Sequence, residues 1–185
     1  MGRLPRQPLN LRARRAWAWA LAGALLCALP CAAASLSGVV VGVADGDTLT
    51  VLDAGLAQHR VRLAGIDAPE KRQAFGQRSK QSLDRLVHGR PVRIEGRKTD
   101  RYGRLVGKVL VGDLDVNREQ VRRGFAWHYV AYAREQSPAD RRLYADAEAS
   151  ARQERRGLWS EPGATPPWEF RRQAHAHANA HAQRP

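Results

Sequence analysis

Residues 60–70 read RVRLAGIDAPE, and they set the architecture of the chain. The first seven of these residues predict a β-strand. Pro69 lacks the amide hydrogen that a central strand needs, so the chain must turn there. Upstream, residues 39–43 and 48–52 are rich in Val, Leu and Thr. The Asp-Gly-Asp sequence at 45–47 joins them, and this pattern predicts a β-hairpin that leads into the strand.

Further elements follow downstream at the spacing of a small mixed domain. They are a helix over 77–87, strands over 91–95 and 105–111, a short helix over 116–123, and a last helix capped by Ser137 and closed by Gly157. Five strands, with helices inserted late in the order, predict a small, partly open five-stranded β-barrel with about three packed helices, which is an α+β fold.

The N-terminus has the pattern of a targeting segment. Residues 1–15 contain five Arg and no acid, residues 16–29 are uncharged and mostly Ala, Leu and Trp, and small residues stand at Ala32 and Ala34. This pattern predicts a secretory signal peptide over 1–34, cleaved after Ala34, and a secreted or periplasmic protein. An uncleaved membrane anchor is the alternative, because no charge appears between Arg15 and Asp45.

The composition favours a polyanionic partner. The 185 residues carry 31 Lys plus Arg and 18 Asp plus Glu, a net charge of +13, and 27 of the 31 cations are Arg. Guanidinium groups match phosphate oxygens in pairs, although an Arg-rich genome would give the same bias. Two Cys exclude a disulfide-dense scaffold and a four-Cys zinc module. Cleavage of the signal peptide would remove five charges and both Cys, and would leave +8.

The C-terminal segment, residues 161–185, is rich in Pro and then in alternating Ala and His. This low-complexity composition predicts a disordered tail that follows a single domain over 35–160. Weak binding of a transition metal by His175, His177 and His181 is an alternative use of the tail.

The acidic residues between 45 and 70 stand out in a basic chain. Asp45 and Asp47 flank one glycine of the hairpin turn, and Asp67 and Glu70 lie three apart on the next turn. If the first three strands are neighbours, both turns lie at one end of the sheet and face one cleft. Converging carboxylates need a cation, and oxygen ligands on flexible loops suit Ca²⁺ better than Zn²⁺. Taken singly, each turn is also compatible with an ordinary hairpin or a helix cap.

Two arginines add to this acidic cluster. Arg62 lies on the third strand, and Arg104 ends a polar loop in which Gly103 permits a tight turn. A phosphodiester held between a metal ion and two guanidiniums is set for hydrolysis, because the cations neutralise the charge that grows during attack. Glu70 is placed to accept the proton of the attacking water. Either arginine alone is equally consistent with a surface ion pair.

These residues resemble the staphylococcal nuclease (thermonuclease) family from about Val39 to Trp159. The matching blocks, in order, are DGDT at 45–48, RLAGIDAPE at 62–70, TDRYGR at 99–104, VN at 116–117 with VRRG at 121–124, and GLW at 157–159. The resemblance implies an OB-fold barrel and Ca²⁺-dependent hydrolysis of DNA and RNA that leaves 3′-phosphates.

The resemblance also implies roles for individual residues. It gives Asp47, Asp67 and the backbone carbonyl of Ala68 as Ca²⁺ ligands, Asp45 as a residue that shapes the metal site, Arg62, Glu70 and Arg104 as catalytic residues, and Arg101, Tyr102 and Tyr132 as substrate contacts. Whether Glu70 is the base or positions the water stays open. The best-known member has Thr where this chain has Ala68, so we expect a different catalytic rate but retained Ca²⁺ binding.

The leading hypothesis is therefore a monomeric nuclease without a stable protein partner. Its substrates would be DNA and RNA that are single-stranded or locally unpaired. The alternative is a noncatalytic OB-fold module that binds single strands through Arg and aromatic side chains, possibly tethered to a membrane. The presence of Arg62, Glu70 and Arg104 together favours the enzyme.

Overall fold

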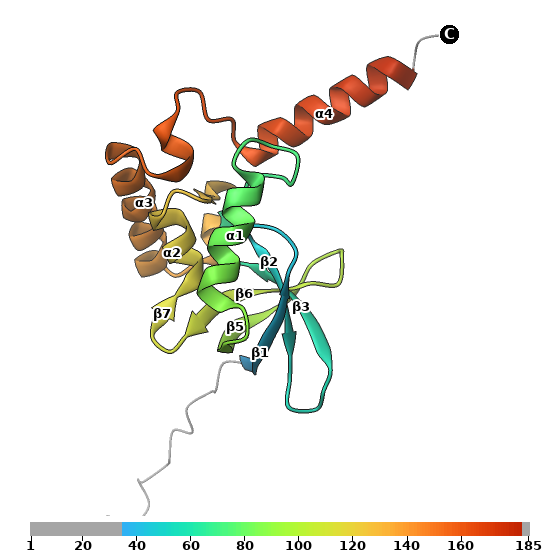
Figure 1. Cartoon of the computed structure of the whole chain (residues 1–185), viewed down its shortest axis with the longest axis vertical. Helices are drawn as coiled ribbons and strands as arrows, with labels where there is room; N and C mark the ends of the chain where they lie inside the picture. Colours follow the sequence, from blue (N-terminus) through green and yellow to red (C-terminus); the bar gives the residue numbers. More distant parts are fainter. Residues whose placement is uncertain (1–34, 183–185) are drawn as a thin grey trace, which may run out of the picture. The chain divides into compact units, whose positions relative to one another are not determined.

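The computed structural model describes residues 35–182, and its centre is a β-barrel (Figure 1). Its six-stranded sheet has the order β3-β2-β1-β5-β6-β7, and a further β3–β6 pairing closes five of the strands into a barrel. The strands of this sheet are β1 (Ser35–Val43), β2 (Thr48–Leu52), β3 (Gln58–Leu63), β5 (Pro91–Thr99), β6 (Leu105–Val111) and β7 (Leu114–Asp115). The predicted α+β barrel is confirmed, but it is closed, because β6 turns back to pair with β3 in parallel.

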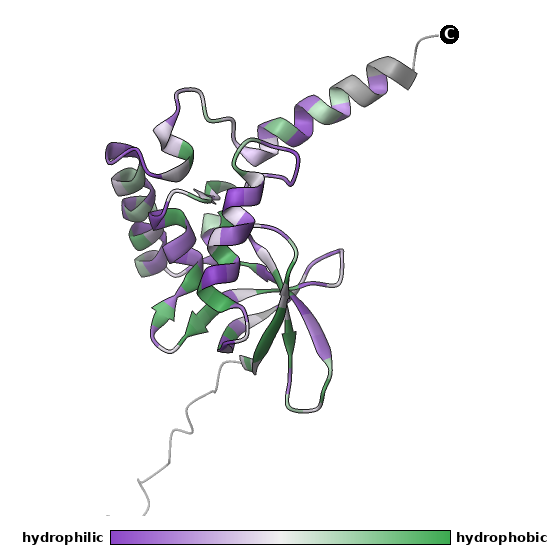
Figure 2. Cartoon of the chain, in the orientation of Figure 1, coloured by the Kyte–Doolittle hydropathy of each residue, from purple (hydrophilic) through white to green (hydrophobic). Residues whose placement is uncertain are grey.

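The barrel is filled by apolar side chains at alternate positions of its strands. Leu49 and Val51 of β2, Val61 and Leu63 of β3, and Ile94 of β5 are almost completely buried. Figure 2 shows the same pattern, with hydrophobic residues concentrated in the strands. The hairpin turn between β1 and β2 therefore joins two strands whose side chains are packed in the core.

The third predicted strand, residues 60–66, is two strands in the structure. β3 ends at Leu63, and β4 (Ile66–Asp67) pairs with β8 (Trp127–His128) in a separate two-stranded sheet. The break occurs at Gly65, whose φ of 73° lies in the left-handed region that favours glycine. The chain thus leaves the barrel just before Asp67.

The three predicted helices are present beside the barrel. They are α1 (Gly76–Val87), α2 (Val116–Arg122) and α3 (Pro138–Gln153), and two short 3₁₀ helices, η2 (Val130–Glu135) and η3 (Gly157–Ser160), accompany them. The last of the three ends before its predicted end at Gly157, which instead begins η3. Ser137 caps α3 as predicted, because its hydroxyl accepts a hydrogen bond from the Asp140 amide at 3.0 Å. Among the helices within residues 35–182, none has the length and apolar character needed to cross a bilayer.

A fourth helix, α4 (Pro167–Ala182), differs from the disordered tail that the sequence predicts over 161–185. Proline fits the first turn of a helix, and alanine has the highest helix propensity, so the Pro and Ala content that indicates low complexity also permits a helix. The first turn of α4 is held by Trp168, whose ring stacks on Tyr129 with centroids 5.2 Å apart. The predicted signal peptide, residues 1–34, lies outside the described residues.

Candidate active site

One cleft of about 1140 Å³ collects all the site residues that the sequence predicts. Its walls come from the β1–β2 turn, the turn after β4, the β5–β6 loop, η2 and the start of α4. The predicted residues in its lining are Asp45, Asp47, Arg62, Asp67, Ala68, Glu70, Arg101, Tyr102, Arg104 and Tyr132. The two acidic turns therefore face one cleft, as expected from neighbouring strands.

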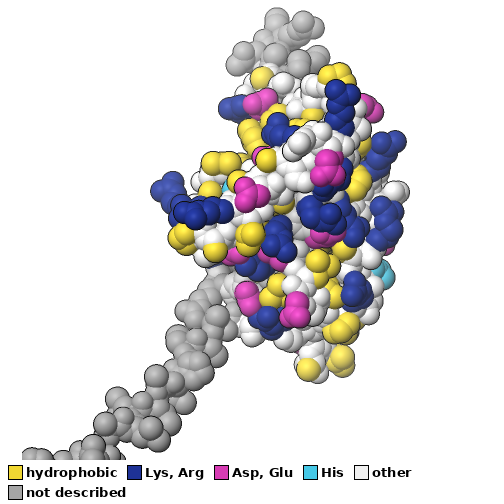
Figure 3. Space-filling model, turned by 90° about the vertical axis from the view of Figure 1, so that its left-hand side faces the viewer, with side chains coloured by type: hydrophobic (Ala, Val, Ile, Leu, Met, Phe, Trp, Pro, Cys, Tyr) yellow, Lys and Arg dark blue, Asp and Glu magenta, His cyan; other side chains and the backbone are white. Residues whose placement is uncertain are grey.

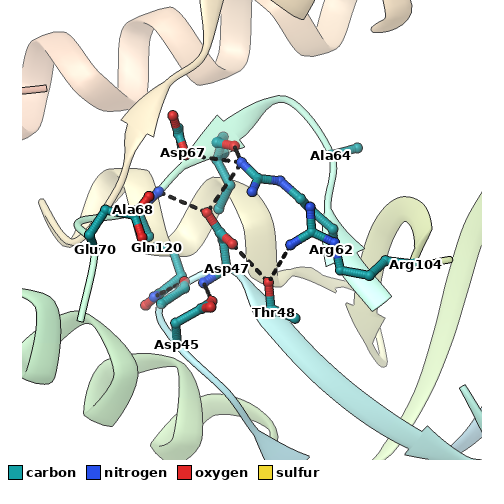
Figure 4. Close-up of polar contacts among 12 residues, drawn as sticks. Asp45, Asp47, Thr48, Arg62, Ala64, Asp67, Ala68, Glu70, Arg104 and Gln120 are labelled. Atoms are coloured by element: carbon teal, nitrogen blue, oxygen red, sulfur yellow. Dashed lines mark hydrogen bonds and ion pairs between the residues drawn. The ribbon is translucent and has the colours of Figure 1, made fainter. Parts of the chain in front are cut away.

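Two buried carboxylates form the floor of this cleft (Figure 4). The Asp47 side chain joins the two turns, because its Oδ2 accepts a hydrogen bond from the Ala68 amide at 2.9 Å and its Oδ1 accepts one from the Thr48 hydroxyl at 3.0 Å. Asp67 is only 1% exposed. Burial raises the pKa of Asp47, and Arg62 opposes this rise. The ionised form of Asp47 would thus be stabilised by a further positive charge in the cleft.

The hairpin turn is fixed by close packing beneath it. A Cβ at Gly46 would overlap the side chains of Ser79 and Ala68, so only glycine fits between the two aspartates. The Gln120 side-chain amide donates to the Gly46 carbonyl at 2.9 Å. Asp45 stays on the turn itself, where its Oδ1 accepts from the Asp47 amide at 3.1 Å. This geometry lets Asp45 shape the position of Asp47.

Arg62 lies between the two carboxylates. Its Nη2 is 3.0 Å from Asp67 Oδ1 and 3.4 Å from Asp47 Oδ2. Burial of the guanidinium acts to lower the pKa of Arg62, but the two aspartates outweigh burial and raise it. The side chain therefore remains a fixed positive charge on the cleft floor.

Arg104 enters from the β5–β6 loop on the same side as Arg62 (Figure 4). Asp100 orients it, because Asp100 Oδ2 accepts from Arg104 Nε at 2.8 Å and lies 2.7 Å from its Nη2. The third nitrogen, Nη1, donates to the Thr48 hydroxyl at 3.3 Å. Partial burial acts to raise the pKa of Asp100, but hydrogen bonds from Arg104 and the backbone outweigh it and lower that pKa. The sequence reasoning missed Asp100, although its position four residues before Arg104 was a visible signal.

Aromatic rings and cations line the mouth of the cleft. The Arg101 and Arg104 guanidiniums lie 4.9 Å and 5.3 Å from the centroid of the exposed Tyr102 ring. Tyr132 is also exposed, and its ring contacts Tyr129 with centroids 5.1 Å apart. Stacking surfaces beside cations suit the bases and phosphates of a single strand. Tyr129 was not foreseen from the sequence.

Glu70 lies on the other side of Asp47 from the two arginines, and it has a partner that the sequence did not indicate (Figure 4). Arg171 of α4 reaches into the cleft, where its Nη1 is 2.7 Å from Glu70 Oε1 and its Nη2 is 2.7 Å from Asp67 Oδ2. The hydrogen bond to Asp67 is the main cause that raises the pKa of Arg171. No sequence signal set this arginine apart, because it stands in a segment of low-complexity composition.

The oxygen donors of the cleft suit a hard cation in type, but they include only two closely placed carboxylates. Carboxylate oxygens of Asp47 and Asp67 and the Ala68 carbonyl are the ligand type that Ca²⁺ prefers. Within residues 35–182, no group of three or more His, Cys, Asp or Glu side chains is placed to hold a metal. A cation here would therefore take two carboxylates, and backbone carbonyls and water would complete its coordination.

A barrel cleft with buried acids, opposed guanidiniums and an aromatic mouth defines a protein that acts on phosphodiesters. Comparison with known proteins identifies the family. The profile described as "Staphylococcal nuclease homologue" matches residues 60–161. The chain belongs to this family, and it is a phosphodiester-hydrolysing endonuclease of the staphylococcal nuclease type.

Three relatives illustrate the similarity. "Protein ParB" of Escherichia coli is 43% identical over 173 residues, which cover 87% of this chain and 95% of ParB. An "Uncharacterized endonuclease" of Haemophilus influenzae is 41% identical over 134 residues and 72% of each chain. A "Micrococcal nuclease" of Shigella flexneri is 41% identical over 148 residues, 75% of this chain and 82% of the relative. The resemblance predicted from the sequence is confirmed.

Proposed function

We propose that this nuclease is a Ca²⁺-dependent, sugar-nonspecific enzyme that cleaves single-stranded or locally unpaired DNA and RNA to leave 3′-phosphates. The proposal rests on one observation: two buried aspartates, two arginines and a glutamate line the same cleft. These residues are Asp47, Asp67, Arg62, Arg104 and Glu70. The protein acts as a monomer in this proposal, because one chain supplies all of these groups.

The residues divide the work of hydrolysis among them. Asp47, Asp67 and the Ala68 carbonyl would hold Ca²⁺, which when bound supplies positive charge to a phosphate oxygen. Arg62 and Arg104 lie on the side of Asp47 away from Glu70 (Figure 4). In this proposal their guanidiniums stabilise the negative charge that develops on the phosphoryl oxygens. The bond between phosphorus and the 5′ oxygen breaks, and the oxygen of the attacking water takes its place on phosphorus. The released 5′ oxygen takes up a proton and becomes a 5′ hydroxyl, so the phosphate remains on the 3′ oxygen.

Glu70 is the side chain that would accept the proton of the attacking water or orient that water. Its side chain is 40% exposed, so it is accessible to solvent in the cleft, unlike the two buried aspartates. As an ionised carboxylate it accepts the proton as the water attacks, or orients the water by a hydrogen bond. Both roles need Glu70 to be free of a competing partner.

The test compares the enzyme with two site variants on plasmid DNA and on RNA, in Ca²⁺ and then in chelator. We expect Ca²⁺-dependent degradation, which falls about 10²–10⁴-fold in Glu70→Gln, where the proton acceptor is lost, and about 10²–10³-fold in Arg104→Ala, where charge stabilisation is lost. Arg142→Ala, on the exposed part of α3, is the control and should retain activity. Intact nucleic acid with a retained gel shift would instead support the noncatalytic binding module.

We further propose that residues 1–34 are a signal peptide and that the enzyme is secreted or periplasmic. Cleavage after Ala34 would leave Ser35, the first residue of β1, so no strand residue is lost. Mass spectrometry of the exported protein should give a chain that begins at Ser35. An intact N-terminus in the membrane fraction would support the anchor instead.

A further inference from the structure

Arg171 lies between two acidic side chains of the cleft, Asp67 and Glu70. Its guanidinium spans both acids, with Nη2 2.7 Å from Asp67 Oδ2, and Nη1 3.3 Å from Asp67 Oδ1 and 2.7 Å from Glu70 Oε1. Arg62 already holds Asp67 Oδ1 at 3.0 Å. Both oxygens of the buried Asp67 carboxylate are therefore engaged by guanidiniums.

The segment that carries Arg171 is docked on the same loops that carry the acids. Trp168, nearly one turn earlier on α4, stacks on Tyr129, whose amide donates to the Gly65 carbonyl just before β4. On the other side, the Gln73 side chain accepts from the Glu70 amide at 3.1 Å and donates to the Thr165 carbonyl. These contacts fix the start of α4, and they therefore place the Arg171 side chain in the cleft.

A guanidinium and a divalent cation compete for this carboxylate. If Asp67 ligates Ca²⁺, the ion and Arg171 share one buried carboxylate at contact distance, and like charges this close repel strongly where water is excluded. The side chain of Arg171 is 38% exposed, so it has a path away from Asp67 into solvent. The two cations therefore exclude each other at this position.

We propose that Arg171 is a built-in counter-cation that occupies the acid pair of the metal-free enzyme, lowers its affinity for Ca²⁺, and keeps Glu70 engaged until the ion displaces it. This inference rests on the proposed Ca²⁺-dependent function. It makes α4, which begins beyond the residues matched by the family profile, a regulator of the active site. The enzyme is then held inactive at low Ca²⁺ concentration by its own C-terminal helix.

Isothermal titration with Ca²⁺ tests the proposal on the purified wild type and the variants Arg171→Ala and Arg172→Ala. Arg172 is the matched control, because it is the next residue of the same helix, also lines the cleft, and its removal takes away the same charge. Among the described residues it pairs only with the half-exposed Glu169, at 3.6 Å. We expect Arg171→Ala to bind Ca²⁺ about tenfold more tightly than Arg172→Ala and the wild type, the size of a typical coupling between two sites. Arg171→Lys retains the charge with fewer donors, and it should fall between Arg171→Ala and the wild type.

Two other outcomes would overturn the inference in distinguishable ways. If the wild type binds Ca²⁺ and cleaves nucleic acid, but Arg171→Ala has the affinity of Arg172→Ala or a weaker one, Arg171 does not compete with the ion and only the inference fails. If none of the proteins binds Ca²⁺, and cleavage by the wild type is unaffected by chelator, the proposed Ca²⁺ dependence fails together with the inference. Thermal unfolding of each variant without Ca²⁺ verifies that the fold is intact.

Discussion

At the scale of single residues, the cleft depends on side chains that position others. Asp100 illustrates this, because it accepts hydrogen bonds from the Arg104 side chain and also from the Tyr102 and Arg104 amides at 2.9 Å and 3.0 Å. The carboxylate thus shapes the β5–β6 loop and aims the guanidinium that the loop carries. In the proposed mechanism, Arg104 and Asp100 therefore act as one unit.

We therefore predict that Asp100→Asn lowers kcat by about tenfold or more while KM changes little, since one misplaced charge costs transition-state stabilisation. The amide oxygen can still accept the backbone hydrogen bonds, so the free energy of unfolding should change by less than about 1 kcal/mol. Steady-state kinetics and urea unfolding give both values. Asp84→Asn, at a half-exposed position of α1 beside His88, is the control and should leave kcat unchanged. An unchanged kcat in Asp100→Asn would show that the loop alone positions Arg104.

Asn117 is a residue whose loss should affect the fold. It is fully buried, and its side chain donates to the Ala64 and Gly107 carbonyls and accepts from the Val109 amide at 3.0 Å. We predict that Asn117→Ala lowers the free energy of unfolding by about 2–4 kcal/mol, because the Ala64 carbonyl and the Val109 amide lose this partner and the Gly107 carbonyl keeps only the Ala64 amide. Urea denaturation measures this, with the exposed Asn179→Ala as the control. A loss below about 1 kcal/mol would contradict the importance of these bonds.

At the scale of elements, α2 combines a buried polar face with an ion-pair cluster. Glu119 of α2 accepts hydrogen bonds at 2.7 Å from Arg122 and Arg123. The hydrogen bond from Arg122 is the main cause that lowers the pKa of Glu119 to about 2, against 4.5 for an unperturbed glutamate. A depressed pKa in the folded state means that the ionised carboxylate stabilises the fold above pH 4.5, and that this stabilisation is lost as the pH falls from 4.5 toward 2.

We predict that Glu119→Gln lowers the free energy of unfolding at pH 7 by about 1–2 kcal/mol, a modest value because Arg122 is half exposed to solvent. The difference from the wild type should shrink as the pH falls below about 4.5. Urea unfolding over a pH series measures it, with Glu169→Gln on α4 as the control. A difference that stays constant with pH would contradict the ion-pair explanation.

The elements also show how far sequence reasoning reaches. The β1–β2 hairpin and helices α1, α2 and α3 were predictable because local propensity, turn residues and caps agree with the tertiary structure. The break at Gly65 was missed, because an apolar run cannot show that a strand changes sheets. The helix α4 was missed because its first turn is held by contacts with distant residues, such as Tyr129.

In the cleft, too, residues on neighbouring turns and strands could be predicted from the sequence, whereas a residue placed by a distant contact could not. Asp47, Asp67, Arg62 and Glu70 stand on turns and strands whose order along the chain already suggests one face, and the structure brings them together. Arg171 is more than 100 positions from Asp67, and only the docking of α4 places it there. A contact of that separation leaves no periodic signal in the sequence.

At the scale of the whole molecule, the net charge of +13 is not a uniform basic surface. On the face that carries α3, Lys and Arg side chains are interleaved with Asp and Glu (Figure 3). Acids thus interrupt the positive charge of this face, and the net charge of +13 is what remains of the 31 cations once the 18 acids are counted. Affinity for nucleic acid should therefore come from the few arginines of the cleft and not from general attraction.

We predict a moderate salt dependence on this basis. If Arg62, Arg101 and Arg104 each contact one phosphate of a single strand, KM should rise about tenfold to twentyfold between about 50 and 200 mM KCl at fixed Ca²⁺. Arg101→Ala should reduce the slope of log KM against log KCl concentration by the contribution of about one phosphate contact, whereas Arg142→Ala should leave this slope unchanged. A KM that does not respond to salt, or a much steeper slope, would contradict binding by the cleft alone.

The parallel pairing of β3 with β6 has a consequence for the order in which the protein folds. It joins Val61 to Leu105 across more than forty intervening residues, and such long-range closure is slow to form. Arg62 and Arg104 lie at this closure, so a chain still emerging from the ribosome has no assembled cleft. Assembly of the cleft therefore depends on the closure of the barrel, and we expect nuclease activity to appear during refolding only after β3 and β6 have paired.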